Sequence, residues 1–158
     1  MRSLGRTWPD DWEARRAGEG CRNCETPRGD IAPSGDPRYF AGEWADAFLK
    51  RDTPAPGYSV VTWHGRHVAD LCEFTPDEAA HFWSDLAIVA RAITAVYGPC
   101  HLNYQFLGNL VPHVHAHVVP RYVDDRAPGT PLIPWEEYTV PEDELAEQVA
   151  RLRAHLAG

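Results

Sequence analysis

The sequence lacks features that define several large classes of protein. No stretch approaches the about 20 uninterrupted apolar residues of a membrane-spanning helix, and residues 1–16 contain no apolar segment of the kind found in secretory signals. Basic residues are in the minority: 15 Lys and Arg stand against 23 Asp and Glu, which gives a formal net charge of −8. This sign disfavours binding to nucleic acid through phosphate neutralisation. We therefore expect a cytoplasmic protein with neither a membrane nor a nucleic acid as its partner.

The sequence also has no internal repeat, low-complexity tract or domain linker. Its 158 residues suit one compact domain, and its 44% hydrophobic and 24% charged residues are close to the globular average. We expect a single domain over residues 1–158. The four cysteines do not indicate a disulfide framework, because cytosolic thiols are kept reduced.

Periodicity and turn residues predict an α+β fold. Strands are expected at 38–41, 43–50, 58–63, 101–107 and 113–119. A long helix is expected to begin with a capping box formed by Thr75 and Glu78 and to end at Gly98. Strands on both sides of one long helix indicate a mostly antiparallel sheet with that helix packed on it. The core should include Trp44, Phe48, Trp63, Phe82 and Trp83.

Two further helices are expected near the ends of the chain. One lies within the first twenty residues and has Trp8 and Trp12 on one face. The other opens at Thr139 to Glu142 and places leucine and valine side chains along one side. Between Cys24 and Asp36 the sequence is rich in turn formers, and we expect an irregular connection there.

Three histidines alternate with small apolar residues in the run PHVHAHVVPR, at His113, His115 and His117. In a strand, side chains two positions apart share a face at roughly 6.6 Å separation, so the imidazoles line one surface while the residues between them face the core. Three readings remain open: a solvated edge-strand face, a metal site, or a nucleophilic histidine that attacks phosphorus. The last requires one ring nitrogen to be held by an acceptor, such as a main-chain carbonyl.

The run H-V-H-A-H-V-V resembles the H-φ-H-φ-H-φ-φ signature, with φ apolar, of the histidine triad (HIT) superfamily of nucleotide hydrolases and transferases. Flanking residues support the resemblance over roughly residues 21–123, with 1–20 and 124–158 as extensions. The matching positions are Asp52, strand 58–63, Arg66-His67-Val68, Asn103, Gly108-Asn109 and Pro120-Arg121. The resemblance implies a HIT-like fold and a homodimer.

The resemblance also implies a mechanism and its residues. His115 would attack the α-phosphorus of a nucleotide, and water would then release a nucleoside monophosphate, while His117 contacts the same phosphate. Asn103 and Asn109 would donate hydrogen bonds to the phosphate oxygens, and Gln105 can take the place of Asn103. Two further residues are implied to bind the substrate: Asp52, at the ribose hydroxyls, and Arg121, in the phosphate pocket. No organic cofactor and no catalytic metal are expected.

The sequence departs from the family pattern at three places. Asn109 stands where Gln is usual, Tyr58 where many members have His, and Trp63-His64-Gly65 where Pro-Lys is common. These changes affect substrate identity more than chemistry. The candidate substrates are dinucleoside polyphosphates, nucleoside phosphoramidates, aminoacyl-adenylates and sugar nucleotides. A metal-dependent enzyme with the three histidines as ligands and a nucleotide-binding protein with little turnover are the alternatives.

Cys21 and Cys24 form a CxxC pair followed by turn residues. Redox activity would require a preceding strand and a helix starting at the motif, so the pair is more typical of half a zinc site, with reduced unligated thiols as the alternative. In some HIT proteins a histidine after the third strand and the first triad histidine complete such a site. The matching residues here are His67 and His113, and they predict a structural zinc. His64 can substitute for either of them.

Overall fold

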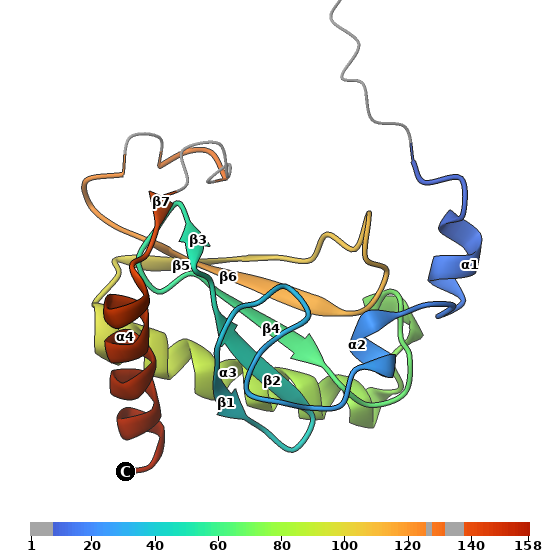
Figure 1. The fold of residues 1–158 in the computed structure, drawn as a ribbon, viewed down its shortest axis with the longest axis horizontal. Helices are drawn as coiled ribbons and strands as arrows, with labels where there is room; N and C mark the ends of the chain where they lie inside the picture. Colours follow the sequence, from blue (N-terminus) through green and yellow to red (C-terminus); the bar gives the residue numbers. More distant parts are fainter. Residues whose placement is uncertain (1–7, 126–127, 132–137) are drawn as a thin grey trace, which may run out of the picture.

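The structure is a computed structural model that describes residues 8–125, 128–131 and 138–158. Five strands form an antiparallel sheet in the order β1-β2-β4-β6-β5 (Figure 1). Their bounds are β1 Arg38–Ala41, β2 Ala45–Leu49, β4 Ser59–Trp63, β5 His101–Gln105 and β6 His115–Arg121. A second, two-stranded sheet joins β3 (Asp52–Thr53) to β7 (Tyr138–Thr139). The predicted α+β fold with a mostly antiparallel sheet is confirmed.

The long helix α3 (Pro76–Tyr97) lies behind the sheet in Figure 1. The predicted capping box is present, because Thr75 Oγ1 accepts a hydrogen bond from the Glu78 amide at 3.2 Å and the Glu78 carboxylate accepts one from the Thr75 amide at 2.9 Å. The C-terminal helix α4 (Glu142–Leu156) packs against α3 and β1. At the other end of the sheet lie α1 (Trp12–Arg16) and α2 (Arg22–Glu25), and a 3-10 turn η1 (Leu71–Glu73) precedes α3.

The hydrophobic core lies between the sheet and the two long helices. Alternate residues of β2, β4 and β6 point to this side, where Trp63 and Phe82 are fully buried. Burial of each large apolar side chain contributes about 1.5–3 kcal/mol. The rest of the core from the sheet and helices is Tyr39, Ala45, Ala47, Leu49, Val61, Ala116, Val118, Leu86, Val89, Ala92, Ile93, Leu145, Val149 and Leu152. Because the helices cover this face of the sheet, a site can form only on the opposite face.

Several local expectations are corrected. Trp83 is 48% exposed on α3. Phe48 is buried, as expected, but on the sheet face opposite the core. The CxxC pair does not lie in an irregular segment: a short helix, α2, begins directly after Cys21 and contains Cys24. Thr139 does not cap α4, which has no side-chain cap; it lies in β7 instead. Of the expected N-terminal helix, residues 1–7 lie outside the described residues, while Trp8 and Trp12 stack with ring centroids 5.4 Å apart.

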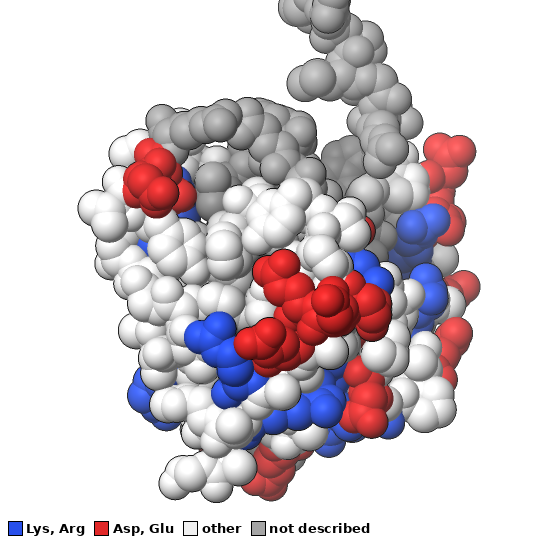
Figure 2. All heavy atoms as spheres, turned by 60° about the vertical axis from the view of Figure 1, so that its left-hand side comes forward, with Lys and Arg blue, Asp and Glu red and all other residues white. Residues whose placement is uncertain are grey.

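Figure 2 shows one face of the molecule, with Lys and Arg in blue and Asp and Glu in red. On the face seen in Figure 2, acidic and basic side chains lie side by side among larger uncharged areas. Within the described residues, every helix is too short or too polar to cross a bilayer.

Candidate functional site

The triad strand β6 places its histidines on the face opposite the core. In the antiparallel register His115 lies opposite Thr62 and His117 lies opposite Val60 on β4, and directly paired residues share a face. This face forms the floor of a cavity of about 620 Å³. The segment after α2 passes in front of β2 and β4 and forms the roof, with residues 110–112 at one side (Figure 1). The two histidines therefore face a space large enough for a small organic ligand.

His115 is held in one tautomer by the backbone. Its Nδ1 lies 2.6 Å from the carbonyl oxygen of His113, and because a carbonyl only accepts, Nδ1 carries the proton. The lone pair of the neutral ring is therefore on Nε2. The hydrogen bond to the His113 carbonyl favours the protonated form of His115, but burial disfavours it more strongly, so the pKa of His115 is lowered. His115 is thus a neutral imidazole with its nucleophilic nitrogen fixed.

His117 lies beside His115, with ring centroids 5.0 Å apart. Burial, and then the neighbouring His115 and Lys50, lower the pKa of His117 to about 4. Its Nδ1 lies 2.7 Å from the hydroxyl of Tyr58. At neutral pH the cavity floor therefore carries two uncharged imidazoles.

Asp46 and Asp36, two acidic residues that line the cavity, are paired with cations. Buried Asp46 accepts two hydrogen bonds from Arg28, at 2.7 and 2.9 Å, and Arg28 also donates to the carbonyl of Gly42 at 2.7 Å. Because Arg28 belongs to the roof and Asp46 to β2, this pair ties the roof to the sheet. Asp36 accepts a hydrogen bond from Lys50 at 2.8 Å. Burial opposes ionisation of Asp36, but Lys50 and the other donors around it outweigh burial and lower its pKa.

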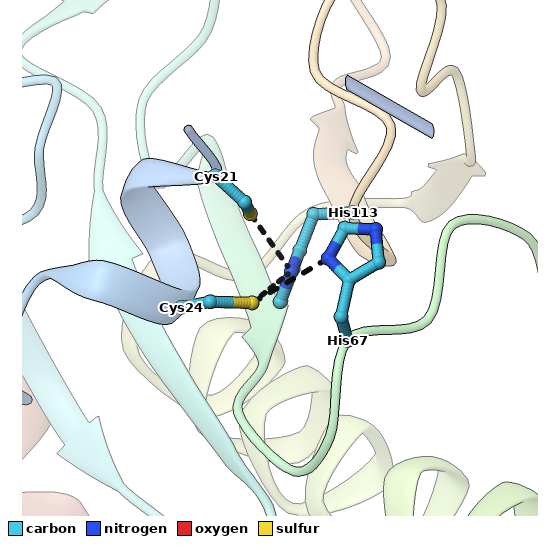
Figure 3. A group of neighbouring side chains, drawn as sticks. All are labelled: Cys21, Cys24, His67 and His113. Carbon is cyan, nitrogen blue, oxygen red and sulfur yellow. Dashed lines mark hydrogen bonds between the residues drawn. The ribbon is translucent and has the colours of Figure 1, made fainter. Parts of the chain in front are cut away.

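Two cysteines and two histidines form a cluster beside the cavity (Figure 3). Cys21 Sγ lies 3.4 Å from His113 Nδ1, and Cys24 Sγ lies 3.5 Å from the same atom and 3.4 Å from His67 Nδ1. The four candidate ligand atoms lie within 4.8 Å of one another. A tetrahedral zinc with bonds of about 2.0–2.3 Å holds its ligand atoms roughly 3.3–3.8 Å apart, so the donor set and spacing fit zinc.

Both histidines of the cluster are oriented by backbone carbonyls. His113 Nε2 lies 2.6 Å from the carbonyl oxygen of Trp63, and His67 Nε2 lies 3.1 Å from that of Arg16. Each Nε2 therefore donates, and each Nδ1 lone pair faces the sulfurs, the arrangement that metal-binding histidines adopt. The backbone at Gly18 packs against the His67 ring. The φ of Gly18 is +94°, and a Cβ at this position would lie 3.0 Å from the ring. Glycine is required at this close approach.

Protonation of Cys24 opposes metal binding. Burial, and then the hydrogen bond with Cys21, raise the pKa of the Cys24 thiol to about 12. A bound divalent cation would displace this proton, since the metal ligand is the thiolate. Among the described residues, His113 groups with Cys21, Cys24 and His67 and not with the other triad histidines. The metal-dependent alternative would therefore have to share His113 with this cluster.

Comparison with known proteins places this geometry in a family. The family described as HIT domain matches residues 41–124, more than half of the 158-residue chain. The chain belongs to the HIT domain family. Protein hit of Bacillus subtilis (strain 168) is 31% identical over 109 residues, which cover 66% of this chain and 72% of that protein.

Solved structures share the HIT fold. A histidine triad protein from Bradyrhizobium japonicum superposes with a TM-score of 0.69 at 18% identity, over 82% of this chain and 99% of that one. A histidine triad family protein from Mycobacterium smegmatis, described as Zn-bound, has a TM-score of 0.59 and 22% identity, over 91% of this chain and 90% of that one.

Within this HIT domain, the predicted substrate residues lie at different distances from the triad. Gln105 on β5 is the direct cross-strand partner of His117, whereas Asn103 lies opposite Val119, two pairs farther along. The register therefore places Gln105 closer to His117 than Asn103 is, and neither residue belongs to the cavity lining. Asn109 is exposed in the loop before β6 and lies outside the cavity lining.

Arg121 and Asp52 also lie outside the cavity lining of the HIT domain. Buried Arg121 pairs with Asp125 at 2.5 Å and donates to the carbonyl of Thr130 at 2.8 Å. Asp52 accepts a hydrogen bond from Thr139 on β7 at 2.6 Å. Their roles in substrate binding stay predictions.

Three residues at the cavity were not selected from the sequence: Arg28, Asp46 and Lys50. Asp46 and Lys50 follow the period-two pattern of β2 that places Phe48 on the cavity face, and this pattern was the available signal. Nothing local in the sequence indicates that Arg28 pairs with Asp46.

Proposed function

We propose that this HIT domain transfers or hydrolyses a nucleoside monophosphate group by covalent catalysis at His115. The observation that carries the proposal is the 2.6 Å contact between His115 Nδ1 and the His113 carbonyl, because it leaves Nε2 as a lone pair at the cavity. A neutral imidazole is a good nucleophile near pH 7.

In the proposed reaction, His115 Nε2 attacks the α-phosphorus of a nucleotide. A phosphorus–nitrogen bond forms, and the bond to the leaving group breaks with its electron pair going to the leaving group, which takes up a proton. A water then attacks the same phosphorus and loses a proton. The phosphorus–nitrogen bond breaks, and the electron pair returns to Nε2 as the nucleoside monophosphate leaves. Gln105 and His117 lie on the same face as His115 and would donate hydrogen bonds to the phosphate oxygens.

The cavity suits a substrate with an apolar and a polar part. Phe48 and Val60 offer apolar surface on the floor, where the base of a nucleotide would stack or pack. The charged pairs of Arg28 with Asp46 and of Lys50 with Asp36 provide donors and acceptors for the ribose and the leaving group. We propose dinucleoside polyphosphates and nucleoside phosphoramidates as the first substrates to test.

We also propose that Cys21, Cys24, His67 and His113 hold a structural zinc. The support is their spacing and the two carbonyl-oriented histidines. Zinc bound by four protein ligands supplies no open position for chemistry and would instead brace the roof segment against the start of the triad strand. The description of the Mycobacterium smegmatis relative as Zn-bound supports zinc as the metal.

A homodimer is the third proposal. Strand β5 is an edge of the sheet, and Trp83, Tyr104 and Leu107 are 44–57% exposed near it. Trp83 contacts Phe106 with ring centroids 5.7 Å apart, which joins α3 to the end of β5 in one apolar surface. Light scattering coupled to size exclusion should give twice the chain mass, and Trp83→Glu should give the monomer. A monomeric wild type at micromolar concentration would contradict the dimer.

Monophosphate release from a panel of substrates tests the catalytic proposal. The panel holds a dinucleoside polyphosphate, a nucleoside phosphoramidate, an aminoacyl-adenylate and a sugar nucleotide. We expect release from at least one by the wild type and loss of that release in His115→Asn. Tight nucleotide binding without release would favour a binding protein with little turnover. Activity that requires a metal bound at His115 and His117 would favour the metal-dependent alternative.

A further inference from the structure

Tyr58 makes a contact that the catalytic proposal does not use. It precedes β4, and its hydroxyl lies 2.7 Å from Nδ1 of His117, with the two rings tilted at 47°. This distance is that of a good hydrogen bond between a hydroxyl and an imidazole nitrogen. His117 lines the cavity, whereas Tyr58 lies outside its lining and contacts His117 from behind the cavity wall.

The two imidazoles of the floor have different partners on the same ring atom. His115 Nδ1 faces a carbonyl, which can only accept, so its proton is on Nδ1. His117 Nδ1 faces a hydroxyl, which can donate. When the hydroxyl donates to the Nδ1 lone pair, the proton of the neutral His117 ring must be on Nε2.

We propose that Tyr58 is a positioning residue that holds His117 as the Nε2-protonated tautomer, opposite to the tautomer of His115. The floor then presents one lone pair, on His115, and one N–H donor, on His117. Both functions come from uncharged rings 5.0 Å apart. This inference rests on the proposed function, because the donor is aimed at the phosphate whose phosphorus His115 attacks.

The pairing of tautomers has a physical advantage. If both rings carried their proton on Nδ1, two lone pairs would face the same phosphate oxygens, and their repulsion would oppose binding. A hydrogen bond that the neutral ring accepts also disfavours its protonated form. Tyr58 therefore keeps His117 as a neutral donor in a cavity where burial already disfavours a cation.

Nitrogen-15 NMR of the histidine-labelled protein tests the proposal without substrate. Protonated and unprotonated ring nitrogens differ in chemical shift, and His117→Asn assigns the signal. We expect the wild type to show His117 protonated on Nε2. In Tyr58→Phe the ring loses its donor, and we expect a mixture of the two tautomers. Tyr39→Phe is the control, since it also removes a tyrosine hydroxyl that makes a hydrogen bond. The Tyr39 hydroxyl donates to Ser59 Oγ at 2.9 Å, and neither residue lines the cavity.

Binding and kinetics provide the second readout. Tyr58→Phe should weaken binding of a nucleoside 5′-monophosphate by about threefold to tenfold and lower kcat by a similar factor, since a donor to a charged group is then present only part of the time. Tyr39→Phe should leave both values at those of the wild type.

Two results would overturn the inference. One is a wild-type His117 protonated on Nδ1. The other is a Tyr58→Phe variant that keeps the Nε2 tautomer or binds the nucleotide as tightly as the wild type. The NMR measurement is independent of turnover, so a protein with the expected tautomers and no monophosphate release would refute the proposed function while leaving the role of Tyr58 intact.

Discussion

His113 Nδ1 lies 3.4 Å from Cys21 Sγ, while the carbonyl oxygen of His113 lies 2.6 Å from Nδ1 of His115. One residue therefore joins the candidate metal cluster to the candidate nucleophile: its side chain belongs to the cluster, and its backbone sets the tautomer of the nucleophile. Anything that holds His113 in place also holds the nucleophilic nitrogen of His115.

Removal of the two cysteines tests the zinc site. Cys21→Ser combined with Cys24→Ser should abolish stoichiometric zinc and lower Tm by roughly 5–10 °C, since each kcal/mol lost shifts Tm by about 2–4 °C in a chain of this size. Cys72→Ser is the control, because Cys72 is exposed and lies outside the cluster. Elemental analysis and thermal unfolding measure both effects. Zinc retained by the double variant would refute the site.

Loss of Arg28 tests whether the roof of the cavity is part of the binding site. Arg28→Ala removes the link between the roof and Asp46 on β2, so part of the binding energy must be spent on ordering the roof. We expect KM to rise about threefold to tenfold with a smaller change in kcat. Arg91→Ala, on the exposed side of α3, should leave KM unchanged. Equal effects of the two substitutions would show that the roof does not contribute.

Asp52→Ala tests whether Asp52 contacts the ribose, as the family resemblance implies, or lies outside the binding site, as the structure indicates. Asp52 is exposed and accepts a hydrogen bond from Thr139, outside the cavity lining. We expect KM to change by less than about twofold, because a residue that does not touch the substrate adds nothing to its binding. A larger rise in KM, with stability unchanged, would restore the ribose role of Asp52.

Stability should depend on pH through His117. Its pKa is about 4 in the folded protein and about 6.5 in an unfolded chain. Between these values the unfolded state binds more protons, so the free energy of unfolding falls as pH is lowered through this window. Denaturant unfolding across the window should show a steeper fall for the wild type than for His117→Gln, which cannot titrate. Parallel curves would mean that His117 titrates normally when folded.

Features that depend on a single helix or strand could be predicted from the sequence. Alternation alone places His115 and His117 on one face of β6, and the capping box at Thr75 marks the start of α3 within a residue. The predicted metal ligands also come together, although that prediction came from the family resemblance and not from spacing.

Contacts between distant segments limited the rest. Thr139 reads as a helix cap, but it pairs with Asp52, 87 residues away, and no local signal announces that pairing. Trp83 follows the apolar periodicity of α3 yet is half exposed. Periodicity shows which side chains share a face of the helix, but it does not show whether another segment packs against each of them. Gln105 replaces Asn103 beside His117 because the register of β5 against β6 depends on both strands.

A nucleotidyl group on His115 is the most direct test of the account. The wild type is mixed with its best substrate, quenched in alkali, in which a phosphorus–nitrogen bond to imidazole persists, and digested for mass spectrometry. The account predicts a nucleoside monophosphate adduct on His115, and in His115→Asn no adduct and a rate lower by at least about a thousandfold. Turnover by the wild type with no adduct, together with a His115→Asn variant of near-normal rate, would contradict covalent catalysis.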